Sequence, residues 1–146
     1  MQLVLFSLSG FLGALPLISV EKVMQSVEIT PLPGAPEIVE GVINLAGNII
    51  PVLNIRRRFC LPEKELSLTD RVIVAKTEKR KVSLIVDSIR EVAAMEAVIE
   101  SGRIYPGLAY VEGVAKIGDD VAFIYDLDAF LSLKENLQLD TAMEGV

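Results

Sequence analysis

The chain has 146 residues, of which 51% are hydrophobic, with one cysteine, no histidine, no tryptophan and a net charge of −6. A chain of this length forms one domain with a sizeable core. Without histidine and with a single cysteine, the chain excludes a disulfide framework, a Cys/His zinc site and a Ser–His or Cys–His catalytic pair. Cys60 stands between Phe59 and Leu61, which favours a buried or half-buried structural thiol.

The negative charge is concentrated in the last quarter of the chain. Residues 1–111 carry twelve acidic and twelve basic side chains, whereas residues 112–146 carry eight acidic and two basic ones. Nucleic acid is therefore excluded as a partner, because its phosphates require a basic surface. The basic triplets at residues 56–58 and 79–81 are too short to change this, and we interpret them as solvated ends of a helix and a hairpin.

The first 20 residues contain no charged side chain, which is also typical of a signal peptide or a membrane span. A signal peptide requires a basic start, and none is present. Gly10, Gly13 and Pro16 disfavour a spanning helix. Two strands that turn at Ser9 and Gly10 explain this stretch, so we expect a soluble protein that does not insert into the membrane.

Taken in chain order, the apolar runs and turn residues predict mainly short strands. The expected strands cover residues 3–8, 12–17, 20–27, 41–45, 49–53, 71–77, 81–86, 88–94, 108–117 and 121–125. Short helices are expected at residues 55–59 and 127–133, a polar connector at 63–70, a mixed loop at 95–107 and a frayed tail after Asn136. The hairpin at residues 41–53 is apolar on both faces, which predicts burial on both sides.

The chain contains an internal repeat. An offset of 72 residues superimposes the hairpin at 41–53 on that at 113–125, and an offset of 69 superimposes the opening strands on residues 72–92. We therefore predict a single all-β domain of two barrel-like subdomains, at about residues 1–69 and 70–134, with a tail at 135–146. Each subdomain has about five strands, and a cleft is expected between the two.

Four aspartates form the densest acidic set: Asp119, Asp120, Asp126 and Asp128. The first two lie in an expected hairpin turn, and the other two precede an expected helix, where carboxylates cap backbone amides. Asn54 holds the corresponding position in the first half. Capping is the main interpretation, and cation binding and catalysis remain alternatives. No phosphate-binding glycine motif is present, so neither an enzyme nor a cofactor is predicted.

The run L-P-G-A-P-E-I-V-E-G-V-I-N-L-A-G-N-I-I-P-V-L-N-I-R-R-R-F, at residues 32–59, resembles the signature of CheW-like domains, the coupling modules of bacterial chemosensory arrays. Residues 14–20, 71–92 and 110–131 fit the same family in the expected order, so the resemblance covers about residues 2–134. It implies two five-stranded SH3-like barrels with short helices. It also implies a non-enzymatic adaptor between the signalling tip of a chemoreceptor and the related regulatory domain of a CheA-type histidine kinase.

The resemblance places the receptor-binding groove beside Asn44, Leu45, Ala46 and Gly47, with Lys22 opposite. Family members usually carry arginine at the position of Ala46 and glutamate at that of Lys22, and these two form an ion pair near the groove. Replacing both partners of such a pair is far less costly than replacing one. We hypothesise a divergent adaptor with an altered receptor contact. The alternative for these residues is an ordinary hairpin turn.

The resemblance also implies that the kinase contacts an apolar face of the second barrel, which an exposed apolar patch would mark. It implies a cytoplasmic protein recruited to receptor arrays at the inner face of the membrane. Two other functions stay open at this point. One is a CheW-like partner-binding module in a motility or developmental pathway, and the other is a sensor of a small ligand or cation.

Overall fold

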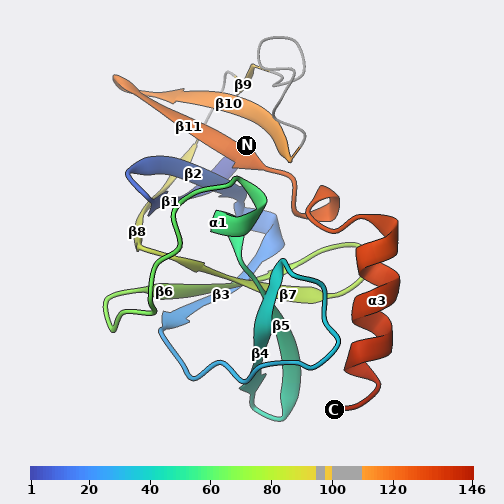
Figure 1. The fold of residues 1–146 in the computed structure, drawn as a ribbon. Helices are drawn as coiled ribbons and strands as arrows, with labels where there is room; N and C mark the ends of the chain where they lie inside the picture. The colour runs from blue at the N-terminus through green and yellow to red at the C-terminus, as the bar shows by residue number, and fades with distance from the viewer. Residues whose placement is uncertain (95–97, 100–109) are drawn as a thin grey trace.

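The computed structural model describes residues 1–94, 98–99 and 110–146, and its strands form two sheets (Figure 1). The strands and helices are β1 (Gln2–Leu8), β2 (Phe11–Pro16), η1 (Leu17–Ser19), β3 (Val20–Gln25), β4 (Val39–Leu45), β5 (Asn48–Leu53), α1 (Ile55–Arg58), β6 (Arg71–Lys76), β7 (Lys81–Val86), β8 (Ser88–Ala94), β9 (Val98–Ile99), β10 (Val111–Ile117), β11 (Asp120–Tyr125), η2 (Leu127–Ala129) and α3 (Leu133–Met143). One sheet has the order β8-β1-β2-β11-β10-β9 and the other β3-β6-β7-β5-β4. The all-β prediction is confirmed, with β9 as a sixth strand of two residues in the first sheet.

The strand order also reflects the internal repeat. The order β8-β1-β2-β11-β10 corresponds strand by strand to β3-β6-β7-β5-β4, and each series contains one parallel pair, β2 with β11 and β5 with β7. The equivalent hairpins β4–β5 and β10–β11 both shift register just before a glycine, Gly41 and Gly113. The two sheets are therefore built to the same plan.

The division of the strands differs from the expected boundary near residue 69. The hairpin β1–β2 pairs with β8 and β11 from the second half, while β3 and β5 pair with β6 and β7. Each sheet thus takes strands from both halves of the chain. An internal repeat identifies equivalent units, but it does not determine which copy of a unit pairs with which.

Three apolar clusters account for the burial of both strand faces. Leu3, Leu5 and Ala14 belong to a cluster on one face of the six-stranded sheet, and Ile43 and Val72 to one on the five-stranded sheet. A third and larger cluster draws residues from both sheets, α1 and α3. Alternate residues of a strand point to opposite faces, so a strand between two clusters is apolar throughout. The predicted burial of the β4–β5 hairpin on both sides is confirmed, and apolar side chains pack where a cleft was expected.

The C-terminal segment forms a helix instead of the expected frayed tail, and the helix expected at residues 127–133 is reduced to the single turn η2. Ser132 and Glu135 form a capping box at the start of α3, in which each side chain accepts from the other's backbone amide. Leu139 is fully buried in the central cluster. This anchor, rather than intrinsic helix propensity, explains why the segment is ordered.

The apolar N-terminus forms the predicted hairpin, β1 and β2, which turn at Ser9 and Gly10. Among the residues that the structure describes, no helix is long and apolar enough to cross a membrane. Most of the expected loop at residues 95–107 lies outside the described residues.

The prediction for Cys60 is wrong, because this thiol is exposed. Its backbone has a φ of 54° just after α1, where the chain turns away and the side chain points to solvent.

Candidate functional site

The turn between β4 and β5 is a two-residue loop, Ala46 and Gly47, with φ values of 51° and 89°. Both angles are positive, as in the type I′ turns that suit the twist of a hairpin. The Asn44 side-chain oxygen accepts a hydrogen bond of 2.9 Å from the Gly47 amide and closes the turn. Asn44, Ala46 and Gly47 are exposed, whereas Leu45 packs partly against the five-stranded sheet's cluster. The turn therefore presents backbone and small side chains to solvent.

Lys22 lies on β3, at the opposite edge of the same sheet from β4. Its pairing with Val74 places it on the face that Val74 and Leu45 share, and its side chain is exposed. Within the described part of the chain, no hydrogen bond or ion pair joins Lys22 to the turn. The structure thus puts Lys22 and the turn on one sheet without direct polar contact.

The three arginines of α1 are structural residues, contrary to the interpretation of this triplet as a solvated helix end. Arg57 lies 3.0 Å from Glu40 and 2.8 Å from Glu63, and Arg58 lies 2.7 Å from Glu135. The Arg58 side chain is only 16% exposed. These pairs fasten the short helix to β4, to the connector and to α3.

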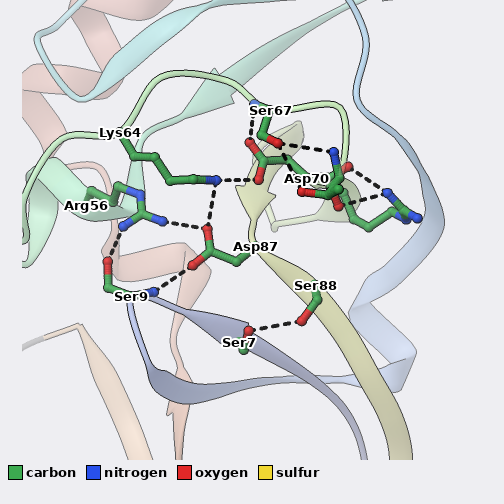
Figure 2. A network of polar contacts seen from close by, with 10 residues as sticks. Ser7, Ser9, Arg56, Lys64, Ser67, Asp70, Asp87 and Ser88 are labelled. Carbon is green, nitrogen blue, oxygen red and sulfur yellow. Dashed lines mark hydrogen bonds and ion pairs between the residues drawn. The ribbon is translucent and has the colours of Figure 1, made fainter.

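Arg56 belongs to a network of polar contacts around Asp87, in the junction between β7 and β8 (Figure 2). Its guanidinium lies 2.6 Å from the Asp87 carboxylate and also donates to the Ser9 hydroxyl. The other Asp87 oxygen accepts from the Ser9 amide at 2.9 Å. Lys64 bridges Asp87, at 3.4 Å, and Asp70, at 2.6 Å. The network joins the β1–β2 turn of one sheet to α1 and to the crossover from the other.

The surroundings of Asp87 change its acidity. Burial raises the pKa of the carboxyl, but the hydrogen bonds from the Ser9 amide and Arg56, together with the charge of Lys64, outweigh burial and hold the pKa below its usual value. Asp87 is therefore charged at neutral pH, as an acceptor for two cations and one amide must be. Asp70, at the far end of the network, is buried and also accepts from the Ser67 amide at 2.8 Å.

An exposed apolar patch lies on the six-stranded sheet. Phe11 and Val121, which are 52% and 47% exposed, are neighbours across the parallel pair β2–β11, where Leu12 is opposite Ala122. Half-buried Phe123 continues the surface toward the central cluster. We call Phe11, Val121 and Phe123 the β2–β11 patch. These three residues line a shallow pocket whose rim carries the loose ion pair of Arg90 and Asp120, 3.9 Å apart.

The acidic residues singled out from the sequence are dispersed. Asp126 precedes η2 but makes no side-chain cap, and Asp128 accepts from the Glu78 amide at 2.8 Å, which braces the β6–β7 turn. Burial, followed by the charges of Asp126 and Asp128, raises the pKa of Glu112. Asn54, by contrast, caps α1 as expected, by accepting from the Arg57 amide. The described residues contain no group of three or more potential ligands that could hold a metal ion.

The CheW-like domain model matches residues 2–135, which is nearly the whole chain. The chain belongs to the CheW-like domain family. The chemotaxis protein CheW of Treponema pallidum is 31% identical over 92% of this chain and 84% of its own, and that of Klebsiella aerogenes is 24% identical over 99% and 89%.

A solved structure extends the similarity from sequence to fold. The scaffolding protein TtCheW of Thermoanaerobacter tengcongensis superimposes on this CheW-like domain with a TM-score of 0.84 at 33% identity, over 92% of this chain and 94% of the other. The expected pair of SH3-like barrels is therefore confirmed.

Sequence reasoning missed three features of this CheW-like domain. The Asp87 network was not predicted, because its members come from separate elements and carry no common spacing. The β2–β11 patch was expected as a type of surface, but not by residue, since its formation depends on β2 pairing with a strand more than 100 residues away. The capping box of α3 could have been found, because serine followed three residues later by glutamate is its signature.

Proposed function

We propose that this chain is a non-enzymatic adaptor that couples the signalling tip of chemoreceptors to the regulatory domain of a CheA-type histidine kinase. The observation that carries the proposal is the family match over residues 2–135, with relatives named chemotaxis protein CheW and a structural neighbour named a scaffolding protein. An adaptor of this kind acts in the cytoplasm, at receptor arrays on the inner face of the membrane.

The β2–β11 patch is the proposed kinase contact. The family resemblance implies an apolar face on the second barrel, and Val121 and Phe123 lie in the second half of the chain, with Phe11 beside them. Large aromatic side chains at the centre of a contact commonly contribute most of its binding energy. The Arg90–Asp120 pair on the rim adds one charge of each sign, which favours specificity over affinity.

The proposed receptor contact is the β4–β5 turn together with Lys22. In this chain the turn carries Ala46 and the facing edge strand carries an exposed lysine, so the surface lacks the ion pair that the family resemblance predicts. The contact therefore differs in charge from that of an ordinary family member. We propose that this adaptor serves a receptor whose tip complements that difference.

Calorimetric titrations test the proposal. The purified chain is titrated with the regulatory domain of the CheA-type kinase and, separately, with a receptor signalling-tip fragment, both from the same organism. Binding to both at about micromolar affinity, which corresponds to about −8 kcal/mol, is expected. Binding to neither overturns the adaptor function, and binding to the kinase alone overturns the receptor half of it.

A further inference from the structure

The hairpin turn that precedes Phe11 of the β2–β11 patch has an unusual conformation for its sequence. Ser9 and Gly10 join β1 to β2 with φ values of 50° and 80°, both in the left-handed region. Such turns favour asparagine, aspartate or glycine at the first position, because other side chains are strained there. Serine is strained in this conformation and is stabilised there by surrounding contacts that fit it.

The contacts that stabilise it come from outside the hairpin. The Asp87 carboxylate accepts from the Ser9 amide at 2.9 Å, and Arg56 donates to the Ser9 hydroxyl while it is paired with Asp87 at 2.6 Å (Figure 2). The Asp87 amide also donates to the Ser7 carbonyl at 2.9 Å. The Arg56 side chain is only 12% exposed, so this pairing is partly shielded from water and from salt. The amide and the hydroxyl of Ser9 are thereby satisfied by residues of the β7–β8 junction and of α1.

The β4–β5 turn provides a contrast within the same chain. Its Ala46–Gly47 loop has the same signs of φ, but it is closed by Asn44 of its own hairpin. The β1–β2 turn is instead supported by α1 and by the β7–β8 junction, which follow strands β5 and β7 of the other sheet. Its geometry therefore depends on how the two sheets are joined, whereas that of the β4–β5 turn is local.

The residue that follows this turn is Phe11, the most exposed member of the β2–β11 patch. Leu8, across the turn, is buried and held by packing, but the ring of Phe11 is half in solvent. Packing therefore fixes Leu8 at one end of the turn. The position of Phe11, at the other end, depends on the backbone conformation of the turn. A change in the φ of Ser9 moves the start of β2 and with it the Phe11 ring.

We propose that Arg56 and Asp87 are positioning residues for the partner surface: they hold Ser9 in its left-handed conformation and so orient Phe11 for contact. The inference rests on the proposed kinase contact and deepens it, because it makes that contact depend on the junction between the two sheets. Asp87 itself lies outside the patch and acts through the turn.

The experiment compares four variants of the full chain in calorimetric titrations with the kinase regulatory domain. Phe11→Ser tests the patch, and Asp87→Asn weakens the network. Glu135→Gln is the matched control. It makes the same acid-to-amide change in the ion pair of 2.7 Å that Glu135 forms with Arg58, another arginine of α1. The fourth variant combines Asp87→Asn with Ser9→Asn, which supplies the Asn-Gly sequence that adopts this turn without external support.

Phe11→Ser and Asp87→Asn are each expected to weaken kinase binding about tenfold, while Glu135→Gln leaves it within about twofold. The Ser9→Asn change is expected to restore binding in the Asp87→Asn background, which a merely stabilising role of Asp87 would not allow. Unchanged binding by Asp87→Asn, or failure of the rescue, overturns the proposal.

Amide hydrogen exchange separates this proposal from the adaptor function. The Ser9 amide is expected to exchange faster in Asp87→Asn than in the wild type or in Glu135→Gln, and to slow again with Ser9→Asn. If the wild type does not bind the kinase, the adaptor function fails while the exchange result still decides whether the network holds the turn. Equal exchange in Asp87→Asn and Glu135→Gln overturns the network's role.

Discussion

Arg58 of α1 and Glu135 of α3 form an ion pair of 2.7 Å that ties the C-terminal helix to the helix that follows β5. Arg58 also stacks over the Tyr110 ring, 5.0 Å from its centre. Arg80, in the turn between β6 and β7, pairs with Asp140 farther along α3. The C-terminal helix is thus fastened along its length to elements of both halves of the chain, and it completes the core.

Loss of the α3 anchor is expected to destabilise the whole domain. Leu139→Ala removes a fully buried side chain from the central cluster and should lower the free energy of unfolding by about 2–5 kcal/mol. Leu137→Ala on the same helix is the control, because that side chain is 60% exposed and its loss should be close to neutral. Urea denaturation measures both. Equal effects would mean that α3 does not form part of the core.

Any side chain at Gly41 is expected to destabilise the folded domain. A methyl group there would lie 2.4 Å from the Thr30 carbonyl oxygen, which accepts from the Val42 amide at 2.8 Å. Gly41→Ala should therefore lower the free energy of unfolding by about 1–3 kcal/mol. Gly145→Ala, whose methyl would meet the nearest atom at 3.6 Å, provides the control for the loss of glycine itself. Urea denaturation of the two variants decides, and similar midpoints would contradict the steric explanation.

The β4–β5 turn offers a stabilising change. Ala46 has a φ of 51° and precedes Gly47, and Ala46→Asn creates the Asn-Gly pair that this turn favours. The free energy of unfolding should rise by about 1 kcal/mol. Ala46→Val should have the opposite effect, because a β-branched side chain is strained at positive φ. Thermal unfolding compares the three proteins. A destabilised Ala46→Asn variant would show that alanine is not strained at this position.

The proposed receptor contact predicts a change of specificity. Replacing Lys22 by glutamate and Ala46 by arginine together introduces the pair that the family resemblance implies. The double variant should bind the receptor tip of an ordinary CheW-containing organism about tenfold more tightly than the wild type does. Calorimetry with that fragment measures the gain, and the kinase domain serves as an unaffected second ligand. If the wild type already binds the ordinary tip as tightly, the altered contact has no functional meaning.

Acid should weaken the fold through Asp87 and Glu135. Burial raises the pKa of Glu135, but the Ser132 amide and Arg58 outweigh it, so the folded pKa values of both acids lie below their unfolded ones. Their contribution is therefore fully present above the unfolded pKa values of about 4 and is lost as the pH falls through the folded values. Urea denaturation from pH 7 to 2.5 should show this loss. The variant carrying Asp87→Asn and Glu135→Gln should lose less stability over the same range, and an unchanged slope would contradict the assignment.

The sequence by itself determined which segments are strands, because strands buried on both faces leave continuous apolar runs such as residues 49–53. It also determined the internal repeat and the family, and it identified the β4–β5 turn and the cap at Asn54. These features depend on neighbours within a few residues or on a fixed offset. Local chemistry and spacing are sufficient to predict them.

The tertiary structure alone decided which strands share a sheet, because pairing β1–β2 with β8 or with β3 satisfies the same apolar pattern. It decided that Asp87 meets Ser9, Arg56 and Lys64, since contacts between residues 23 to 78 positions apart have no signature in the chain. It also decided that residues after Asn136 form a helix, because Leu139 gains its stability only from the core that it enters. Long-range packing, and not local propensity, brings these groups together.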